Sequence, residues 1–212
     1  MSFLRNLSYP RPIAPERVIV VWGDSTANGA GAGGANTIRA YLAALFTPKR
    51  FVVNCGIGGE PPVEIADRFV AQPYIMRDAI HIIYFGRASY SELASDFTAQ
   101  ADRCWAARPN DRMLFMVPGP GANANEQTED SAQITISNDA RADLIASYPS
   151  NYIDQMQALW DAVDPGDDQV DLDAENIGYC PPKFLADDIH RNSAGQEVEA
   201  GAIHAAIAAK GW

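Results

Sequence analysis

Three residues of this sequence, Ser25, Asp187 and His190, have the types and spacing of a nucleophile with its base. A serine hydroxyl becomes a strong nucleophile when a base takes its proton. A histidine can serve as that base if a carboxylate holds its ring through the other nitrogen. The Asp-x-x-His spacing keeps the carboxylate and the imidazole within reach of each other. The alternative is that Ser25 caps a helix while Asp187 and His190 are surface loop residues.

The elements next to these residues could hold them in place. Ser25 follows the apolar run 18–22, which predicts a buried strand. In open α/β folds, ligands bind at the carboxyl ends of such strands. His190 precedes the last predicted helix, where Ser193 and Gln196 form the Ser-x-x-Gln pattern of a capping box.

Strand-like and helix-like runs alternate along the rest of the chain. The predicted strands are residues 18–22, 51–54, 80–85, 113–117 and 169–172, and the predicted helices are 37–46, 63–71, 91–107, 151–163 and a last helix from 193. The alternation predicts a five-stranded parallel sheet covered on both faces, which is a three-layer α/β/α domain. We expect this domain over residues 17–212, after an extended N-terminal arm, 1–16. Residues 118–140 predict a long loop at the functional edge of the sheet.

The motifs resemble those of the SGNH hydrolase superfamily, also called GDSL esterases and lipases. Gly23-Asp24-Ser25 matches its first block, and Asp187 to His190 matches its last. In the segment 54–60, Gly59 is the better match to the glycine of the second block, and Gly58 is the alternative. The resemblance implies a flavodoxin-like fold and hydrolysis of carboxylic esters, often acetyl groups on sugars. It implies a Ser-His-Asp triad and neither metal nor cofactor.

The third block departs from the pattern of the superfamily. The resemblance implies an oxyanion hole built from the amides of Ser25 and Gly59 and from an asparagine side chain, but this sequence has Ala88 at the asparagine position. Losing one such donor costs about 10²–10³ in rate. Three explanations are open: a natural loss of activity, a donor from another residue, or an engineered Asn→Ala change. The preceding Arg87 is either a substrate-binding residue or a solvated loop arginine.

Other motifs favour different chemistry only weakly. The segment 29–34 satisfies G-x-G-x-x-G but starts too late after the strand for dinucleotide binding, so a loop beside the nucleophile is the preferred interpretation. The alternating acids at 171, 173 and 175 lack the glycine of a calcium-binding loop and predict a solvated acidic loop. His81 and His204 lie inside a predicted strand and helix and have no adjacent carboxylate in the sequence. We expect both to be structural.

Composition narrows the classes of partner. The 212 residues include 27 acidic and 16 basic ones, for a net charge of −11, which argues against nucleic acid or an anionic membrane surface as a partner. The three cysteines, Cys55, Cys104 and Cys180, are far apart and predict buried thiols rather than a zinc site or disulfides. The sequence has no apolar run long enough to span a bilayer.

Together these features predict a serine esterase that acts on a small-molecule or carbohydrate ester, with activity weakened at Ala88. The alternative from another class is a catalytically silent module that binds a carbohydrate or a partner on an esterase fold. The N-terminus has no signal-peptide pattern, so a cytoplasmic location is the default expectation. An extracellular or virion-associated location would fit a trimmed chain.

Overall fold

The computed structural model describes residues 17–33, 37–73, 76–86, 94–117, 119–121 and 131–212. The predicted N-terminal arm, 1–16, lies outside these residues, as do Arg87 and Ala88. Within them, a parallel sheet is built from β1 (Val18–Gly23), β2 (Phe51–Gly56), β3 (Ile80–Tyr84) and β4 (Met113–Met116), in the order β2-β1-β3-β4. This order begins as the flavodoxin-like order does, with the switch between β1 and β3.

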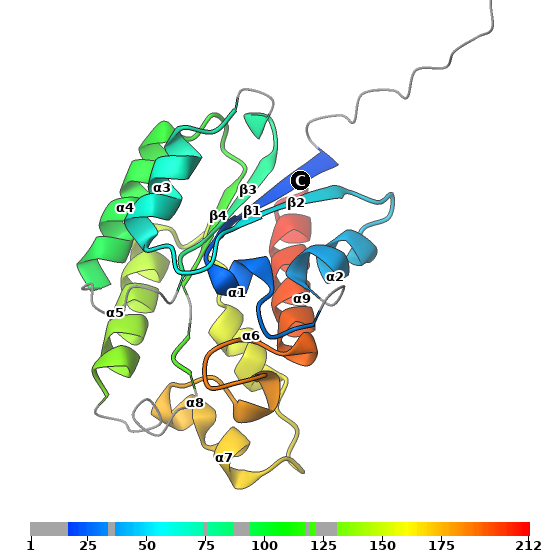
Figure 1. Ribbon diagram of the computed structural model, residues 1–212, viewed down its shortest axis with the longest axis vertical. Helices are drawn as coiled ribbons and strands as arrows, with labels where there is room; N and C mark the ends of the chain where they lie inside the picture. Colours follow the sequence, from blue (N-terminus) through cyan, green and yellow to red (C-terminus); the bar gives the residue numbers. More distant parts are fainter. Residues whose placement is uncertain (1–16, 34–36, 74–75, 87–93, 118, 122–130) are drawn as a thin grey trace, which may run out of the picture.

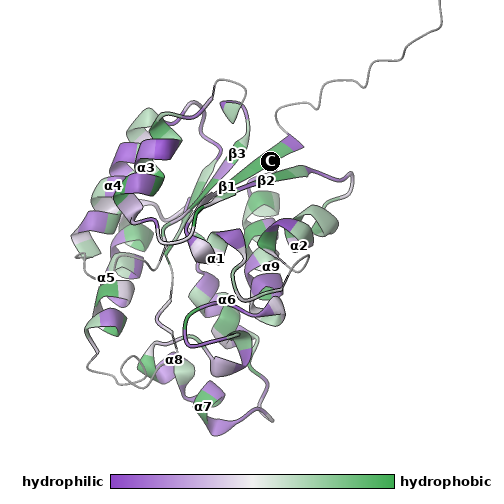
Figure 2. Ribbon diagram, viewed as in Figure 1, coloured by the Kyte–Doolittle hydropathy of each residue, from purple (hydrophilic) through white to green (hydrophobic). Residues whose placement is uncertain are grey.

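Helices cover both faces of the sheet (Figure 1). On one side lie α3 (Pro62–Val70), α4 (Ala94–Ala107) and α5 (Ala132–Ser147), and on the other lie α2 (Ile38–Leu45) and α9 (Ser193–Ala209). Alternate residues of β1 serve the two cores: Val20 and Trp22 face the first, and Ile19 and Val21 face the second. Figure 2 shows that the strands of the central layer are largely hydrophobic, whereas the helices on either side of them carry both hydrophobic and hydrophilic residues. The predicted three-layer α/β/α architecture is confirmed.

A smaller apolar cluster lies beyond the carboxyl end of the sheet. It joins α6 (Gln155–Asp161), α8 (Ala174–Ile177) and a 3₁₀ helix (Pro182–Phe184), through residues such as Leu159, Tyr179 and Phe184. The short helix α7 (Gln169–Leu172) precedes α8 in this region. No helix in the described segments is long and apolar enough to cross a membrane.

The predicted fifth strand, 169–172, is wrong, because this segment is α7 and the described sheet has four strands. Its Asp171 is buried and accepts a hydrogen bond from the amide of Lys183 at 2.9 Å. The place beside β4 is taken by an isolated bridge between Phe115 and Tyr152. The run Gln-Val-Asp-Leu alternates polar and apolar residues, but four residues are too few for this alternation to separate a strand from a helical turn.

Two other local predictions need correction. The loop predicted over 118–140 contains the start of α5, because Ser131 caps this helix by accepting from the amide of Ile134 at 3.2 Å. The predicted capping box of the last helix is also wrong. Asn192 is the N-cap and accepts from the amide of Gly195 at 3.0 Å. Gln196 instead donates to the carbonyl of Thr26, so its amide joins two elements far apart in the sequence.

Candidate active site

The turn from β1 into α1 (Ser25–Asn28) brings Ser25 to the carboxyl edge of the sheet. A Cβ on Gly23 would lie 2.5 Å from Ala27 Cβ and 2.6 Å from the carbonyl oxygen of Tyr84, so the close turn requires glycine there. Asp24 is buried and caps α1 by accepting from the amide of Thr26 at 2.8 Å. The predicted alternative, Ser25 as the helix cap, is therefore wrong, since Asp24 has that position.

The structure brings Ser25, His190 and Asp187 together. His190 Nε2 lies 3.1 Å from Ser25 Oγ, and His190 Nδ1 lies 2.9 Å from Asp187 Oδ2. Asp187 Oδ1 also accepts from the amides of Ile189 and His190, at 2.7 and 2.6 Å. Partial burial acts to raise the pKa of Asp187, but the hydrogen bonds from His190 and Ile189 lower it below its usual value.

An ionised Asp187 fixes the tautomer of the imidazole. The carboxylate accepts a hydrogen bond from the Nδ1–H of His190, which leaves Nε2 without a hydrogen and able to accept the hydrogen bond of the Ser25 hydroxyl. An arrangement of this kind can activate a serine hydroxyl as a nucleophile. The site is open to water, because the side chain of His190 is 23% exposed and that of Asp187 is 55% exposed.

A buried polar cluster beneath His190 was not predicted from the sequence. Arg191 and Glu199, which are 1% and 0% exposed, form an ion pair with Nε and Oε1 3.0 Å apart. Tyr84 on β3 donates its hydroxyl to the same carboxylate oxygen at 2.8 Å. The residue that follows His190 is thereby tied to both α9 and the centre of the sheet. The cluster becomes visible only in the structure, where both charged side chains are buried. An arginine and a glutamate eight positions apart form no sequence pattern that predicts it.

The glycine-rich segment packs against the other side of His190. Gly31 has φ +87°, and a Cβ there would lie 2.8 Å from His190 Cβ and 2.9 Å from the carbonyl oxygen of Arg191. The described part of the motif, up to Gly33, therefore follows α1 and lies beside the histidine. This agrees with the predicted loop near the nucleophile.

A second arginine holds the loop that carries the predicted oxyanion glycines. Arg68 Nε donates to both carboxylate oxygens of Glu60, at 2.8 and 2.9 Å, and Nη1 donates to the carbonyl of Cys55 at 2.8 Å. Nη2 lies 3.3 Å from the carbonyl oxygen of Gly23. Arg68 therefore joins the ends of β1 and β2 to the loop at residue 60. This contact was also missed from the sequence.

The two candidate glycines in this loop differ in conformation. Gly59 has φ +82°, and a Cβ there would meet nothing within 4 Å, whereas a Cβ on Gly58 would lie 3.7 Å from Ser25 Cβ. The backbone conformation at position 59 therefore favours glycine, whereas position 58 lies closer to Ser25. The oxyanion-hole role of Gly59 and of the Ser25 amide stays a prediction, as do the roles of Arg87 and Ala88 outside the described residues.

The remaining candidates have structural partners. His81 is buried in β3 and accepts from Trp22 Nε1 at 3.2 Å, and burial lowers its pKa to about 4. The ring of His204 packs on Phe46 at 4.7 Å between centroids. Cys104 and Cys180 are buried and Cys55 is partly buried, and no disulfide joins any of the three. Within the described segments no group of three or more His, Cys, Asp or Glu side chains could hold a metal ion.

Comparison with known proteins identifies the fold. No protein-family model matches the sequence, and no curated protein matches it. A lipase/acylhydrolase from Enterococcus faecalis has a similar structure, with a TM-score of 0.67 at 17% identity over 92% of this chain and 96% of that one. A member of the lipolytic G-D-S-L family from Veillonella parvula gives a TM-score of 0.63 at 13% identity over 87% and 94%.

A third similar structure is an acetylxylan esterase from Geobacillus stearothermophilus, solved as a catalytic mutant. It has a TM-score of 0.61 at 14% identity over 90% of this chain and 93% of that one. These likenesses confirm the SGNH-type fold that the motifs predict. At such low identity they describe the architecture alone.

Proposed function

We propose that this chain, which has the fold of GDSL-type lipolytic proteins, is a serine esterase whose catalytic unit is residues 17–212. One observation carries the proposal: Ser25 Oγ, His190 Nε2 and Asp187 form a continuous chain of contacts at 3.1 and 2.9 Å. The contacts join residues 165 positions apart in the sequence, which a surface loop and a simple helix cap would not require.

In this mechanism Ser25 Oγ attacks the ester carbonyl carbon while its proton passes to His190 Nε2. Asp187 keeps the ring oriented and stabilises the imidazolium. The carbon–oxygen bond to the alcohol then breaks, His190 returns its proton to the leaving alkoxide, and an acyl-enzyme on Ser25 remains. Water, deprotonated by His190, attacks this acyl group and releases the carboxylic acid and free Ser25. The amides of Ser25 and Gly59 would hold the oxyanion, without a side-chain donor from Ala88.

The alcohol part of the substrate is proposed to be a carbohydrate. The similar structures include an acetylxylan esterase, and the exposure of His190 and Asp187 leaves room for a group attached to a larger molecule. We propose acetyl as the acyl group, because the similar structures include an acetylxylan esterase. No metal or cofactor takes part in any step of this scheme.

Release of p-nitrophenol from p-nitrophenyl acetate tests the proposal. We expect slow turnover by the present chain, loss of turnover in Ser25→Ala, and a gain of about 10²–10³ in kcat for Ala88→Asn. Equal rates for Ser25→Ala and the unchanged chain would exclude Ser25 as the nucleophile. No gain in Ala88→Asn would overturn the oxyanion-hole assignment at position 88 and leave the nucleophile standing.

A second candidate is a binding module that keeps the esterase fold without turnover. Ala88 is the feature that favours it, because it stands where the superfamily that this sequence resembles has an asparagine. Treating Ala88→Asn with a fluorophosphonate probe separates the two functions. Covalent labelling of Ser25 would exclude the silent module, and an unlabelled, folded protein would support it.

A further inference from the structure

The proposed mechanism assigns no role to the glycine-rich segment that follows α1. This segment begins with Gly29, Ala30 and Gly31, four to six residues after Ser25. Both glycines have left-handed backbone conformations, with φ of +88° and +87°. Residues with side chains rarely adopt such angles, so the path of the chain here depends on glycine. The contacts at the two ends of this short path indicate what it does.

The beginning of the segment is bonded to the backbone of the proposed nucleophile. The amide of Ala30 donates to the carbonyl of Ser25 at 2.9 Å. The amide of Gly29 is directed to the same carbonyl and to that of Thr26, which it meets at 3.1 Å. The left-handed turn at Gly29 ends α1 and makes both contacts possible. The position of Ala30 is therefore tied directly to the residue that carries the nucleophilic hydroxyl.

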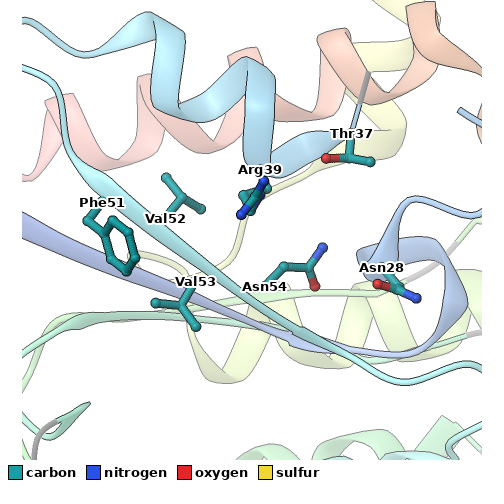
Figure 3. A pocket seen from close by; sticks show the side chains of 7 residues that line it. All are labelled: Asn28, Thr37, Arg39, Phe51, Val52, Val53 and Asn54. Atoms are coloured by element: carbon teal, nitrogen blue, oxygen red, sulfur yellow. The ribbon is translucent and has the colours of Figure 1, made fainter. Parts of the chain in front are cut away.

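The end of α1 is itself held by β2 and by the start of α2, in the wall of the pocket that Figure 3 shows. Asn54 Nδ2 donates to the carbonyl of Ala27 at 2.9 Å. A Cβ on Gly29 would lie 2.4 Å from Cγ2 of Thr37, so the turn packs directly on the N-cap of α2. The turn at Gly29 is thereby fixed relative to the sheet.

The other end of the path packs against the loop that carries His190. A Cβ on Gly31 would lie 2.8 Å from His190 Cβ and 2.9 Å from the carbonyl oxygen of Arg191. It would also lie 3.0 Å from Ala186 Cβ, on the other arm of the same loop. The amide of Ala186 donates to the carbonyl of His190 at 2.8 Å, which joins the two arms. A side chain at position 31 would therefore displace the histidine together with its loop.

We propose that residues 29–31 form a spacer that sets the distance between Ser25 Oγ and His190 Nε2, with Gly31 as a positioning residue. Ala30 contacts the backbone of Ser25 and Gly31 contacts His190, and the Cα atoms of these neighbours are only about 3.8 Å apart. Proton transfer needs the 3.1 Å contact, and a displacement of about 1 Å can cost on the order of 10² in rate. This inference rests on the proposed esterase function and adds a positioning residue to it.

Gly31→Ala and Gly33→Ala form a matched pair of variants. Both glycines have positive φ, +87° and +70°, so both substitutions strain the backbone, but a Cβ on Gly33 would meet nothing within 4 Å. In the Ala88→Asn background, whose higher expected rate makes a loss measurable, Gly31→Ala should lower kcat for p-nitrophenyl acetate about tenfold to a hundredfold. KM should change less than about twofold, and Gly33→Ala should keep kcat within about twofold. Equal kcat values in the two variants would overturn the positioning role.

Insertions test the spacer without adding a clash, and they serve if Gly31→Ala does not fold. One glycine inserted after Ala30 lengthens the path between the contact with Ser25 and the contact with His190. This insertion should lower kcat by about tenfold or more. One glycine inserted after Gly33 lengthens the chain beyond the spacer and should leave kcat within about twofold. An unchanged kcat after the first insertion would contradict the proposal.

Crystal structures of the matched pair supply a readout that needs no turnover. In Gly31→Ala the separation of Ser25 Oγ and His190 Nε2 should exceed hydrogen-bond distance, whereas in Gly33→Ala it should stay near 3.1 Å. An unchanged contact in Gly31→Ala would overturn the inference. If Ser25→Ala hydrolyses p-nitrophenyl acetate as fast as its parent, the esterase proposal fails on its own. The two structures would still decide whether Gly31 positions His190.

Discussion

Arg68 and Arg191 each pair with a glutamate on opposite sides of the candidate site, but in different surroundings. The side chain of Arg68 is 26% exposed, and its donors are shared between Glu60 and the carbonyls at the ends of β1 and β2. Arg191 is 1% exposed and meets Glu199 inside the core. The first pair holds a loop to the sheet edge, and the second holds the backbone next to His190.

The difference in burial sets what each pair can do. A buried ion pair must offset the loss of water around both charges, so removing one partner leaves the other charge uncompensated. A partly exposed arginine keeps some water and loses less when its partner is removed. Removing a partner of the Arg191–Glu199 pair should therefore lower the stability of the protein. Removing a partner of the Arg68–Glu60 pair should instead lower the catalytic rate of a protein that stays folded.

The largest expected effect is on the buried pair. Glu199→Ala leaves Arg191 and the hydroxyl of Tyr84 without their shared acceptor, and should lower the free energy of unfolding by about 3–5 kcal/mol. Urea unfolding followed by circular dichroism measures this change. Glu197→Ala, two positions away on the exposed side of α9, is the matched control and should stay within about 0.5 kcal/mol. Similar losses in both variants would remove the distinction between the two pairs.

The next expected effect is a loss of stability at low pH, which originates at His81, close to Arg68. Arg68 lies over the Trp22 ring at 5.7 Å, and Trp22 donates to His81, whose pKa burial lowers to about 4. In the unfolded chain His81 becomes protonated as the pH falls below about 6.5, whereas in the folded chain it stays neutral down to about pH 4. Stability should therefore be intact above pH 6.5 and fall by about 3 kcal/mol as the pH drops to 4.

Urea unfolding at intervals between pH 7 and pH 4 measures this loss. His81→Gln should remove most of the pH dependence in this range, while His204→Gln, in the half-buried helix position, should keep it. If the slope with pH survives in His81→Gln, another group is responsible for it.

A smaller effect should appear in the rate. Arg68→Ala removes the hydrogen bonds that join Glu60 and the carbonyl of Cys55, so the loop with Gly58 and Gly59 loses its anchor. We expect kcat for p-nitrophenyl acetate to fall about tenfold to a hundredfold with a smaller change in KM, because a displaced oxyanion donor weakens transition-state binding. Arg103→Ala, which breaks the exposed pair with Asp67 and a hydrogen bond to Gln100 on the same helix, should leave kcat unchanged. An unchanged kcat in Arg68→Ala would contradict the anchoring role.

The smallest effect separates the two glycines of that loop. Gly59→Ala places a side chain at φ +82° and should cost about 1 kcal/mol of stability. Gly58→Ala meets only an ordinary contact of 3.7 Å with Ser25 Cβ and should cost less. Thermal unfolding of both variants measures the difference. The reverse order would show that the close approach at Gly58, rather than the backbone of Gly59, fixes the loop.

Much of the architecture could be predicted from periodicity. The strands β1 to β4 are short apolar runs between breakers, and the motifs at Ser25 and His190 mark the two ends of the site. The contact of Asp187 with His190 could be predicted from spacing, because the two residues are only three positions apart. The contact of His190 with Ser25 depends on the fold, and there the superfamily resemblance supplied what spacing could not.

The errors arise where tertiary contacts override local signals. The segment of α7 contains one buried acid, Asp171, whose partner Lys183 is distant in the sequence. Gln196 has the right spacing for a capping box, yet its side chain bonds to Thr26 and Ile38 instead. The pairs of Arg68 and Arg191 were missed for the same reason. Charged residues are usually at the surface, and nothing local marks those that pack inside.

The single bridge between Phe115 and Tyr152 has a consequence for how copies of this protein meet in solution. Phe115 donates to the carbonyl of Asn151 and accepts from the amide of Ile153, both at 2.8 Å. The backbone groups of Phe115 are thereby used within the chain, in the middle of a strand of four residues. A sheet edge with so few free groups is a poor template for strand-to-strand aggregation. One residue pair thus protects this side of the sheet against self-association.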